Sequence, residues 1–388
     1  DSHGNIYMFV TNASFNGTLL SGNLGLTGQG MTFSGTQNPT PSQTNTLAGG
    51  MSANPLTAGQ SGGTGGAVAP TVTGTTSSTI VTTTVSGNTT YYYSQPVTIT
   101  HYSDGSSTTA NNGSATLTGS QTTGSATITA SQQSMVNSVQ TRQAAITGTT
   151  GSSVYIQQSG AGDVYTITQI GQGNKVDGAT YDSTSGAMGY QTYAQFAGGS
   201  NQVTIRQGDP ASQAGKNIAD VSVNGSGNYL NINQGTDANG VYTGTDTGGH
   251  YQYVWVNGGN NNITTQQEST GTQGQFGVIA VTGSSNTVQE TQTGSAQHQA
   301  FINVNGSYNS VTTSQSGTTS NYLSIGTTGN NNSATVSQTN GGNNANITLI
   351  NAGSPASVNL TQTGGQSYGI TQTCYTAACG TITLRQGN

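Results

Sequence analysis

Apolar and polar residues alternate with a period of two in short segments of the second half of the chain. In residues 201–207, Val203 and Ile205 alternate with polar neighbours, and Gln207 continues the alternation. Residues 357–362 and 381–386 follow the same pattern. Alternation over about six residues rich in Val, Ile and Thr predicts a strand with one buried face. A second short segment precedes each of these, as at 220–223 and 301–304. The pattern therefore predicts flattened coils of two strands and two turns.

These segments recur in a twelve-residue frame that closes on glutamine. The frames start at residues 158, 196, 223, 256, 281, 304, 327, 351 and 375, and every surplus residue falls between one frame's glutamine and the next frame. A repeated unit with insertions at one corner is typical of a solenoid. The sequence thus predicts an all-β fold, with a β-solenoid of about nine two-strand rungs over residues 151–388. The closing glutamines are Gln169, Gln207, Gln234, Gln267, Gln292, Gln315, Gln338, Gln362 and Gln386.

A buried glutamine is costly unless its amide is hydrogen-bonded. Stacked rungs would place identical residues about 4.8 Å apart, close enough for each amide to bond its neighbours in a continuous ladder. The alternative is that glutamine only reflects a polar composition. Nine occurrences at one frame position favour the ladder.

Two further frame positions predict the bend between the strands. Glycine stands at the third position, where a positive φ is expected, and asparagine at the sixth, where a positive φ or a side-chain bond to the backbone is expected. The glycines are Gly160, Gly198, Gly225, Gly258, Gly283, Gly306, Gly329 and Gly353, and the asparagines are Asn201, Asn228, Asn261, Asn286, Asn309 and Asn332.

The frame resembles the curlin repeat of bacterial curli fibres, which reads Gln-x-Gly-x-x-Asn-x-Ala-x-x-x-Gln. Residues 158–169 fit it with Asp163 in place of asparagine, and residues 327–338 fit it with Thr327 at the first position. The resemblance covers about residues 154–388 and implies a subunit of an extracellular fibre. The opening position departs from the family, since only Gln158 is glutamine there. The other residues at this position are Phe196, Val223, Val256, Val281, Val304, Thr327, Asn351 and Tyr375. This departure favours a solenoid with a drier core over spontaneous amyloid-type polymerisation.

The first 150 residues have a different character. Residues 1–34 predict short strands with tight turns, residues 35–79 a Pro/Gly/Thr-rich linker or arm, and residues 80–150 a Thr/Ser-rich β region. Asp104-Gly105 is a hairpin-turn signal within that region. An apolar cluster could add as a strand to a neighbouring subunit, or could equally pack on its own chain. Its residues are Ile6, Tyr7, Met8, Phe9 and Val10.

Composition limits the partners. Charged residues are only 4% of the chain and the net charge is −6, and the five basic residues are scattered, which argues against nucleic acid. The sequence contains no run of 18 apolar residues, so no membrane-spanning helix is predicted. The chain begins at Asp1, which is consistent with a trimmed chain or a removed secretion signal, and we favour the signal.

The two cysteines also favour an oxidising compartment. Cys374 and Cys379 flank the bend of the last frame, where Ala377 replaces the usual glycine. A disulfide there would staple the terminal rung, and the alternative is a free or redox-active pair. Two cysteines without a nearby histidine do not predict a metal site.

Catalysis finds little support in the sequence. The eleven acidic residues and four histidines (His3, His101, His250 and His298) are spread thinly, with no two acids expected at one position of adjacent rungs. A polysaccharide-cleaving solenoid would need paired carboxylates or an acid–base cluster. The segment that ends at Asp163 resembles half of a calcium-binding glycine-rich repeat, but it occurs only once, and such sites need several copies. We therefore expect no enzyme, cofactor or metal. The chain also has an aromatic cluster, Tyr251, Tyr253 and Trp255. We interpret these residues first as strand or core aromatics and only second as a carbohydrate-binding platform.

Three functional hypotheses follow. The first is a secreted, structural subunit of a biofilm or surface-attachment fibre, whose main partner is itself by head-to-tail stacking, with strand exchange as an option and a polysaccharide or cell surface as a second partner. The second is a phage tail or capsid fibre. The third and weakest is a carbohydrate-acting β-helix enzyme. A head-to-tail contact that does not close gives an open filament.

Overall fold

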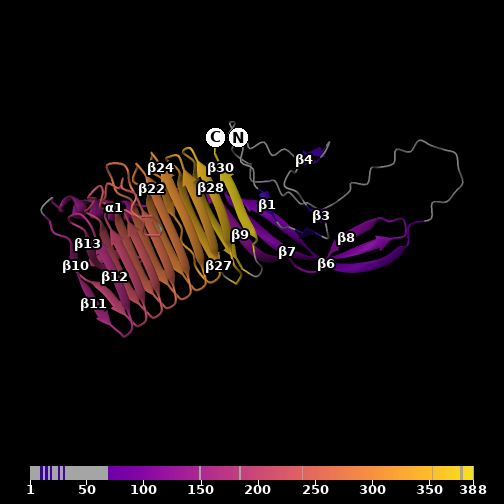
Figure 1. Ribbon diagram of the computed structural model, residues 1–388. Helices are drawn as coiled ribbons and strands as arrows, with labels where there is room; N and C mark the ends of the chain where they lie inside the picture. Colours follow the sequence, from indigo (N-terminus) through magenta and orange to yellow (C-terminus); the bar gives the residue numbers. More distant parts are fainter. Residues whose placement is uncertain are drawn as a thin grey trace.

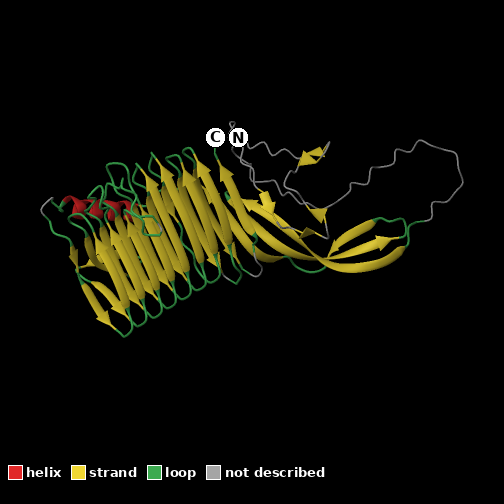
Figure 2. Ribbon diagram, in the orientation of Figure 1, coloured by secondary structure: helices red, strands yellow, loops and turns green. Residues whose placement is uncertain are grey.

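A computed structural model describes residues 69–387, except 148–149, 183–184, 238, 352 and 376–378, together with five short strands in residues 9–30. Two long sheets face each other and wind into a solenoid, from which a narrow β arm projects at one end (Figures 1 and 2). One sheet has ten strands and ends each rung on glutamine; we call it the glutamine sheet. The other has sixteen strands and is called the long sheet. The predicted β-solenoid of nine parallel rungs is confirmed.

The glutamine sheet stacks nine parallel strands, with each frame in register with the next. Gln207, for example, pairs in register with Gln234, and Gln234 with Gln267. The strands are β12 (Val164–Gln169), β16 (Gln202–Gln207), β18 (Tyr229–Gln234), β20 (Asn262–Gln267), β22 (Thr287–Gly294), β24 (Ser310–Gly317), β26 (Ser333–Thr339), β28 (Ser357–Thr363) and β30 (Thr381–Gln386).

The long sheet supplies the opposite wall of the solenoid. Its first rung is formed by β10 (Ser153–Val154) and β11 (Ile156–Ser159), which pair with β13 (Lys175–Tyr181) and β15 (Ala194–Ala197). Strand β14 (Met188–Gln191) folds back antiparallel on β13. The remaining parallel strands are β17 (Ile218–Asn224), β19 (Tyr251–Asn257), β21 (Phe276–Thr282), β23 (Gln299–Asn305), β25 (Tyr322–Ser324), β27 (Asn344–Asn351) and β29 (Ser367–Cys374).

Three antiparallel strands extend the long sheet beyond its last rung. Strand β9 (Thr116–Gly124) pairs with β29, β7 (Thr89–Tyr102) pairs with β9, and β6 (Val72–Ser86) pairs with β7 along its whole length. Strand β8 (Ser107–Asn111) joins β7 through the turn at Asp104-Gly105, as the sequence predicts. The predicted end of the linker at residue 79 is wrong, because Thr- and Val-rich residues from Val72 onward already form β6. Residues 35–68 lie outside the described residues.

Five short strands are described at the N-terminus. They are β1 (Phe9–Thr11), β2 (Ser14–Phe15), β3 (Thr18–Leu19), β4 (Gly25–Leu26) and β5 (Gln29–Gly30). Strands β2 and β3 pair with each other, as do β4 and β5, whereas β1 pairs with β30 at the end of the glutamine sheet.

A helix interrupts the region predicted to be entirely β. Helix α1 (Ala130–Ala144) begins at Thr129, whose side chain accepts from the backbone N–H of Gln132 while Gln132 bonds back to Thr129. This reciprocal capping box satisfies the first turn. The predicted β region over 80–150 is therefore wrong at residues 130–144, where a capped segment without glycine or proline packs as a helix against the long sheet.

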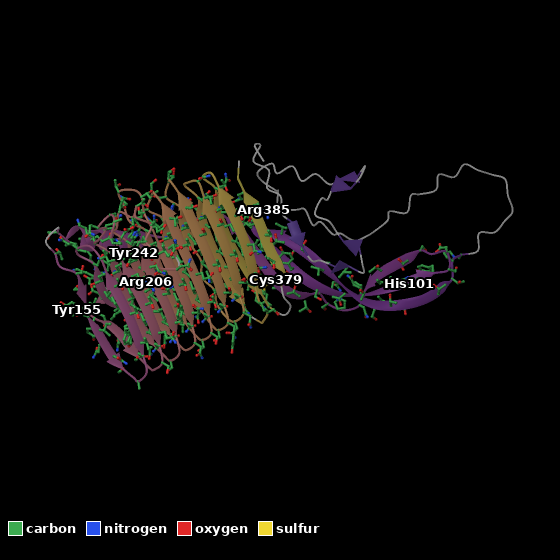
Figure 3. All side chains as sticks on the ribbon, viewed as in Figure 1. His101, Tyr155, Arg206, Tyr242, Cys379 and Arg385 are labelled. Atoms are coloured by element: carbon green, nitrogen blue, oxygen red, sulfur yellow. A yellow bond between two sulfur atoms is a disulfide. The ribbon has the colours of Figure 1, made fainter. Side chains whose placement is uncertain are left out.

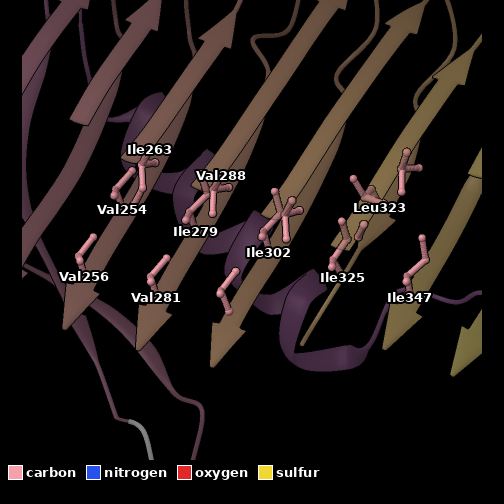
Figure 4. Packing of buried hydrophobic residues seen from close by; sticks show 14 of the residues in the cluster. Val254, Val256, Ile263, Ile279, Val281, Val288, Ile302, Leu323, Ile325 and Ile347 are labelled. Atoms are coloured by element: carbon pink, nitrogen blue, oxygen red, sulfur yellow. The ribbon is translucent and has the colours of Figure 1, made fainter. Parts of the chain in front are cut away.

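Apolar side chains fill the space between the two sheets. Val254, Val256, Ile263, Ile279, Val281, Val288 and Ile302 are fully buried there and pack along the solenoid axis (Figure 4). The frame's opening position contributes Phe196, Val223, Val256, Val281 and Val304 to this core, so the expected drier interior is confirmed. Burying each such side chain contributes roughly 1.5–3 kcal/mol.

A second apolar cluster lies on the outer face of the long sheet. Helix α1 covers this face with Val136 and Val139, and the sheet contributes Tyr253, Phe276 and Val278. The central strands of the long sheet are therefore buried on both faces, which explains why β19, β21 and β23 read as nearly continuous apolar runs.

Candidate assembly interface

The nine glutamines form the predicted ladder without a break. The amide Nε2 of each glutamine from Gln169 to Gln362 donates to Oε1 of the next, at 2.8–3.1 Å. The other N–H of the same amide donates to the backbone carbonyl of the first residue in the long-sheet strand of that rung. Gln292, for example, donates to Phe276. Each amide thus stitches neighbouring rungs together and also bridges the two sheets. This accounting explains how the side chains can be buried.

The column ends differently at its two ends. Within the described residues, Gln169 Oε1 accepts no hydrogen bond and Gln386 Nε2 donates none. The ladder therefore has an acceptor end at the first rung and a donor end at the last.

The asparagines at the sixth frame position form a second column. The backbone N–H at the sixth frame position donates to the side-chain oxygen at the same position one rung earlier. These bonds run from Asn201 to Asp163 up to Ala356 to Asn332, at 2.8–3.0 Å. The predicted side-chain-to-backbone bonding is confirmed. A positive φ at these asparagines is not observed.

The left-handed residues of the bend lie elsewhere. Positive φ occurs at the predicted glycines from Gly160 to Gly329, such as Gly225 at 143°, and at the residue just before each asparagine, such as Asn260 at 57° and Tyr308 at 59°. At Gly225 a side chain would also collide with the backbone of Gly258 on the next rung. Glycine is thus required there by both conformation and close stacking.

A third column was not predicted. Asn174, Asn217, His250, Gln275, His298, Asn321 and Asn343 each accept the backbone N–H of the next member or, at the end, of Gln366. The two histidines accept through Nδ1, so Nε2 carries the proton. His250 Nε2 donates to Asp246 and His298 Nε2 to the carbonyl of Thr293. With both ring nitrogens engaged, these histidines hold the fold and are not free for acid–base chemistry.

A sequence signal for this column existed. Five members, Asn217, His250, Gln275, His298 and Asn321, lie six residues before the start of the next frame. Counting forward from the preceding glutamine hides the regularity, because the insertions fall in that interval.

Two acidic residues do meet on adjacent rungs, contrary to the sequence expectation. Asp177 and Asp220 pair in register on β13 and β17, and Arg142 of α1 bonds Asp220 through both terminal nitrogens, at 2.6 and 3.0 Å, and Asp177 at 3.2 Å. Tyr251 also donates to Asp220, and the ring of Tyr190 stacks on the guanidinium at 3.7 Å.

The electrostatics of this cluster are those of a structural anchor. Burial raises the pKa of Asp220, against the opposing effect of Arg142 and Tyr251. Burial and the charge of Asp220 also raise the pKa of Asp177. Burial opposes the charge of Arg142, but hydrogen bonding and charge from Asp220 outweigh it and raise its pKa. The two carboxylates therefore both pair with the guanidinium of Arg142 and do not form the free carboxylate pair of a glycosidase.

A hollow of about 830 Å³ adjoins this anchor, between α1 and the β14 hairpin. Its floor includes Tyr251 and Phe301, which are buried. The interpretation of Tyr251, Tyr253 and Trp255 as an exposed carbohydrate platform is wrong: Tyr251 and Tyr253 are buried in the cluster on the outer face of the long sheet, and Trp255 packs against Tyr181.

The C-terminal end of the solenoid is largely closed by its own chain. Strand β9 pairs along residues 369–374 of β29, and β1 pairs along residues 381–383 of β30. The predicted disulfide joins Cys374 and Cys379. It lies against β9, since a side chain at Gly119 would collide with Cys379 Sγ. The disulfide thus closes the loop after β29, the strand to which β9 pairs.

The apolar N-terminal cluster was predicted either to contact another subunit or to pack on its own chain. Phe9 and Val10 belong to β1, whose backbone pairs with β30 of the same chain, as in the second alternative. Ile6, Tyr7 and Met8 lie outside the described residues.

The opposite end of the solenoid is open. Strand β12 pairs only with β16, and β10 and β11 pair only with β13 and β15, among the described residues. Val154 and Ile156 are in register with Val176 and Ala194, which lie in the core, yet they remain 39% and 38% exposed. Tyr155 is 59% exposed and lies at the far end of the solenoid from Cys379 (Figure 3). The interior is therefore uncovered at the first rung.

No family model, curated protein or solved structure matches this chain. Among the described residues, no helix is long and apolar enough to cross a membrane. The same residues contain no group of three or more His, Cys, Asp or Glu side chains arranged to hold a metal ion.

Proposed function

We propose that this protein is a structural subunit of an extracellular fibre, in which copies of the chain add to one another end to end. One observation carries the proposal: the solenoid is largely closed by β1 and β9 at one end and open at the other. Joining the open end of one copy to the opposite end of the next is a heterologous contact, and a heterologous contact whose rotation does not close produces a filament.

The composition of the open end supports self-association. A solenoid normally needs a terminal cap to remain soluble, but the first rung presents Val154, Tyr155 and Ile156 beside strand edges that no other described strand pairs with. Unprotected edge strands add further strands readily. The lack of an internal cap is explained if another copy supplies it.

Three sequence features support an extracellular location. The repeat resembles that of curlin fibres, only 4% of residues are charged, and the disulfide between Cys374 and Cys379 is typical of an oxidising compartment. We therefore propose secretion to a biofilm matrix or an attachment structure.

A structural role also agrees with the use of the acidic residues. Asp177 and Asp220 are held by Arg142, Asp246 by His250, and Glu290 is sealed in the core. None of these groups combines the exposure and paired geometry that glycoside hydrolysis requires. We propose that the protein is not an enzyme.

Electron microscopy and fibre diffraction of the purified full-length protein test the proposal. We expect filaments with an axial repeat of about 4.8 Å, the spacing of stacked strands. Protein that remains as discrete monomers at all accessible concentrations would contradict it. Immunolabelling then separates the cellular origin from the viral one: label on cell surfaces supports the proposed matrix fibre, whereas label confined to virions replaces it with a virion appendage.

A further inference from the structure

The arm carries a second open edge in the same sheet. Residues 89–94 of β7 pair with β9 on one side and with residues 81–86 of β6 on the other. Among the described residues, the inner half of β6, residues 80–86, therefore forms the outermost strand of the long sheet where that sheet leaves the last rung. The outer half of β6 belongs to the part of the arm that β8 joins.

The inner half of β6 lacks the devices that usually protect an edge strand. Residues 80–86 read Ile-Val-Thr-Thr-Thr-Val-Ser, without charge or proline. Val81 and Val85 are 56% and 60% exposed. Natural proteins normally block such edges with lysine, proline or a bulge, and β-branched residues favour strand pairing.

The two open edges of the long sheet match each other. The first rung offers residues 153–159, which read Ser-Val-Tyr-Ile-Gln-Gln-Ser and are also uncharged. Both edges are seven residues long, both expose apolar side chains, and they stand at opposite ends of one sheet. An edge at each end of a single sheet is the arrangement that lets identical copies continue that sheet.

We infer that residues 80–86 of one copy add as a strand to residues 153–159 of the next, so that the long sheet runs unbroken from copy to copy. This inference rests on the proposed fibre function and specifies its contact. The added strand covers Val154 and Ile156, whose register partners are already in the core. It plays the part at the first rung that β9 plays at the last rung within one chain.

Two charge variants of the full-length chain break one edge each. The arm variant carries Val81→Lys and Val85→Lys, and the first-rung variant carries Tyr155→Lys and Ile156→Lys. Tyr308→Lys is the matched control, because Tyr308 is 65% exposed on a mid-solenoid bend. Circular dichroism and the thermal midpoint show whether each variant keeps the fold.

Each edge variant is expected to stay monomeric where wild type assembles, with the critical concentration raised at least about tenfold, which corresponds to about 1.4 kcal/mol. The control should assemble as wild type does. Mixing the two edge variants is the decisive step: the arm variant keeps an intact first rung and the first-rung variant keeps an intact arm. Light scattering should therefore detect a one-to-one dimer that cannot grow.

The outcomes separate this inference from the proposed function. Filaments from either edge variant at the wild-type concentration, or a mixture that stays monomeric, would overturn the inference while wild-type filaments still support the fibre. Failure of wild type to assemble would overturn the fibre proposal and this inference with it. The mixture remains informative even if the first rung frays in its variant, because only the arm of that variant is needed.

Discussion

Gln315 illustrates how this protein buries amides in its core. Its Nε2 donates to Gln338 Oε1 and to the carbonyl of Gln299, and its Oε1 accepts from Gln292. Each of these groups would otherwise be desolvated without a partner, at a cost of about 1–3 kcal/mol. The repeat supplies every partner from an equivalent position one rung away, so one residue choice satisfies the whole column.

Replacing Gln315 by Leu is expected to lower the free energy of unfolding by on the order of 2–4 kcal/mol. The change leaves one N–H of Gln292 and Oε1 of Gln338 without a partner and removes the bond to the Gln299 carbonyl, and added apolar burial offsets part of the loss. Gln289→Leu is the matched control, since Gln289 lies on the adjacent strand and is exposed. Urea unfolding measures both. Equal losses in the two variants would mean that the ladder does not stabilise the rungs.

Glu290 is a buried acid without a cation beside it among the described residues. It is buried between the sheets, and its Oε2 accepts from Gln252 Nε2 at 3.1 Å. Its Oε1 and Gln252 Oε1 have no other partner, and both face the space over Gly277, where a Cβ would collide with each of them. Two acceptors facing each other require a proton between them. Burial raises the pKa of Glu290 to about 8, and we expect the protonated acid to donate from Oε1 to Gln252 Oε1.

Stability should therefore fall between about pH 4.5 and pH 8. The unfolded carboxyl ionises near its ordinary pKa of 4.5, whereas the folded one keeps its proton to about 8. The stabilisation is fully present below pH 4.5 and is lost as pH rises to 8. At about 1.4 kcal/mol per pH unit, the loss is on the order of 4–5 kcal/mol.

Glu290→Gln removes the titrating group and keeps the shape and the bond to Gln252. Its unfolding free energy should depend less steeply on pH over this range than that of wild type and should be higher at pH 8. Urea midpoints at pH 5 and pH 8 measure the difference. The same pH slope in the variant would show that another group is responsible.

The residue columns differ in how far the sequence predicts them. The glutamine ladder follows from a fixed offset within the frame, and the asparagine column from another. The third column and the Asp177–Asp220 pair lie beyond the insertions, where equal positions in space have unequal positions in sequence. Insertions hide such contacts from a frame count even though stacking brings them together.

At the level of elements, α1 acts as a strap along the solenoid. Gln132 near its start bonds Tyr322 on β25, and Arg142 near its end bonds Asp220 on β17. The ten residue-to-residue steps from Gln132 to Arg142 rise about 15 Å, and their long side chains reach the rest of the roughly 19 Å between the first and last of five strands. The helix therefore links rungs that are otherwise joined only to their neighbours.

Arg142→Ala should release the end of the strap near β17. It leaves the buried Asp220 carboxylate without its cation, and breaking such a pair costs about 3–5 kcal/mol. Hydrogen exchange of residues 130–144 should quicken together with the loss of stability. The double variant Arg142→Met with Asp220→Asn removes both charges and should recover part of the stability. A single variant that leaves helix exchange unchanged would show that Arg142 does not anchor α1.

The helix was missed for a physical reason that the strands did not share. Strand alternation repeats nine times and reinforces itself, whereas α1 occurs once and buries few apolar residues, among them Val136 and Val139. Its usable signals were the Thr129–Gln132 capping pair and the absence of glycine and proline from 130 to 144. Ser- and Gln-rich composition concealed them.

At the scale of the whole molecule, the chain visits the two ends of the solenoid in reverse order. It first forms the arm and β9 against the last rung, then returns along the outer face through α1, and only then builds the first rung. The closing strands are thus supplied from residues before the repeats, and they serve the C-terminal end. Nothing in the described residues does the same for the first rung, which is why stability should be uneven along the stack.

Hydrogen exchange should reveal this gradient in the dilute monomer. Amides of β10–β12 should exchange fastest among the parallel strands, because they have one neighbour and an uncovered core. Those of β19–β23 should be slowest, since the long sheet is buried there on both faces and local opening tracks burial. In filaments, residues 153–159 and 80–86 should gain protection together. Residues 107–111 of the arm serve as the internal control and should stay fast. A first rung already as protected as β21 in the monomer would show that this end is stable without a partner, and would remove the physical reason for its addition to another copy.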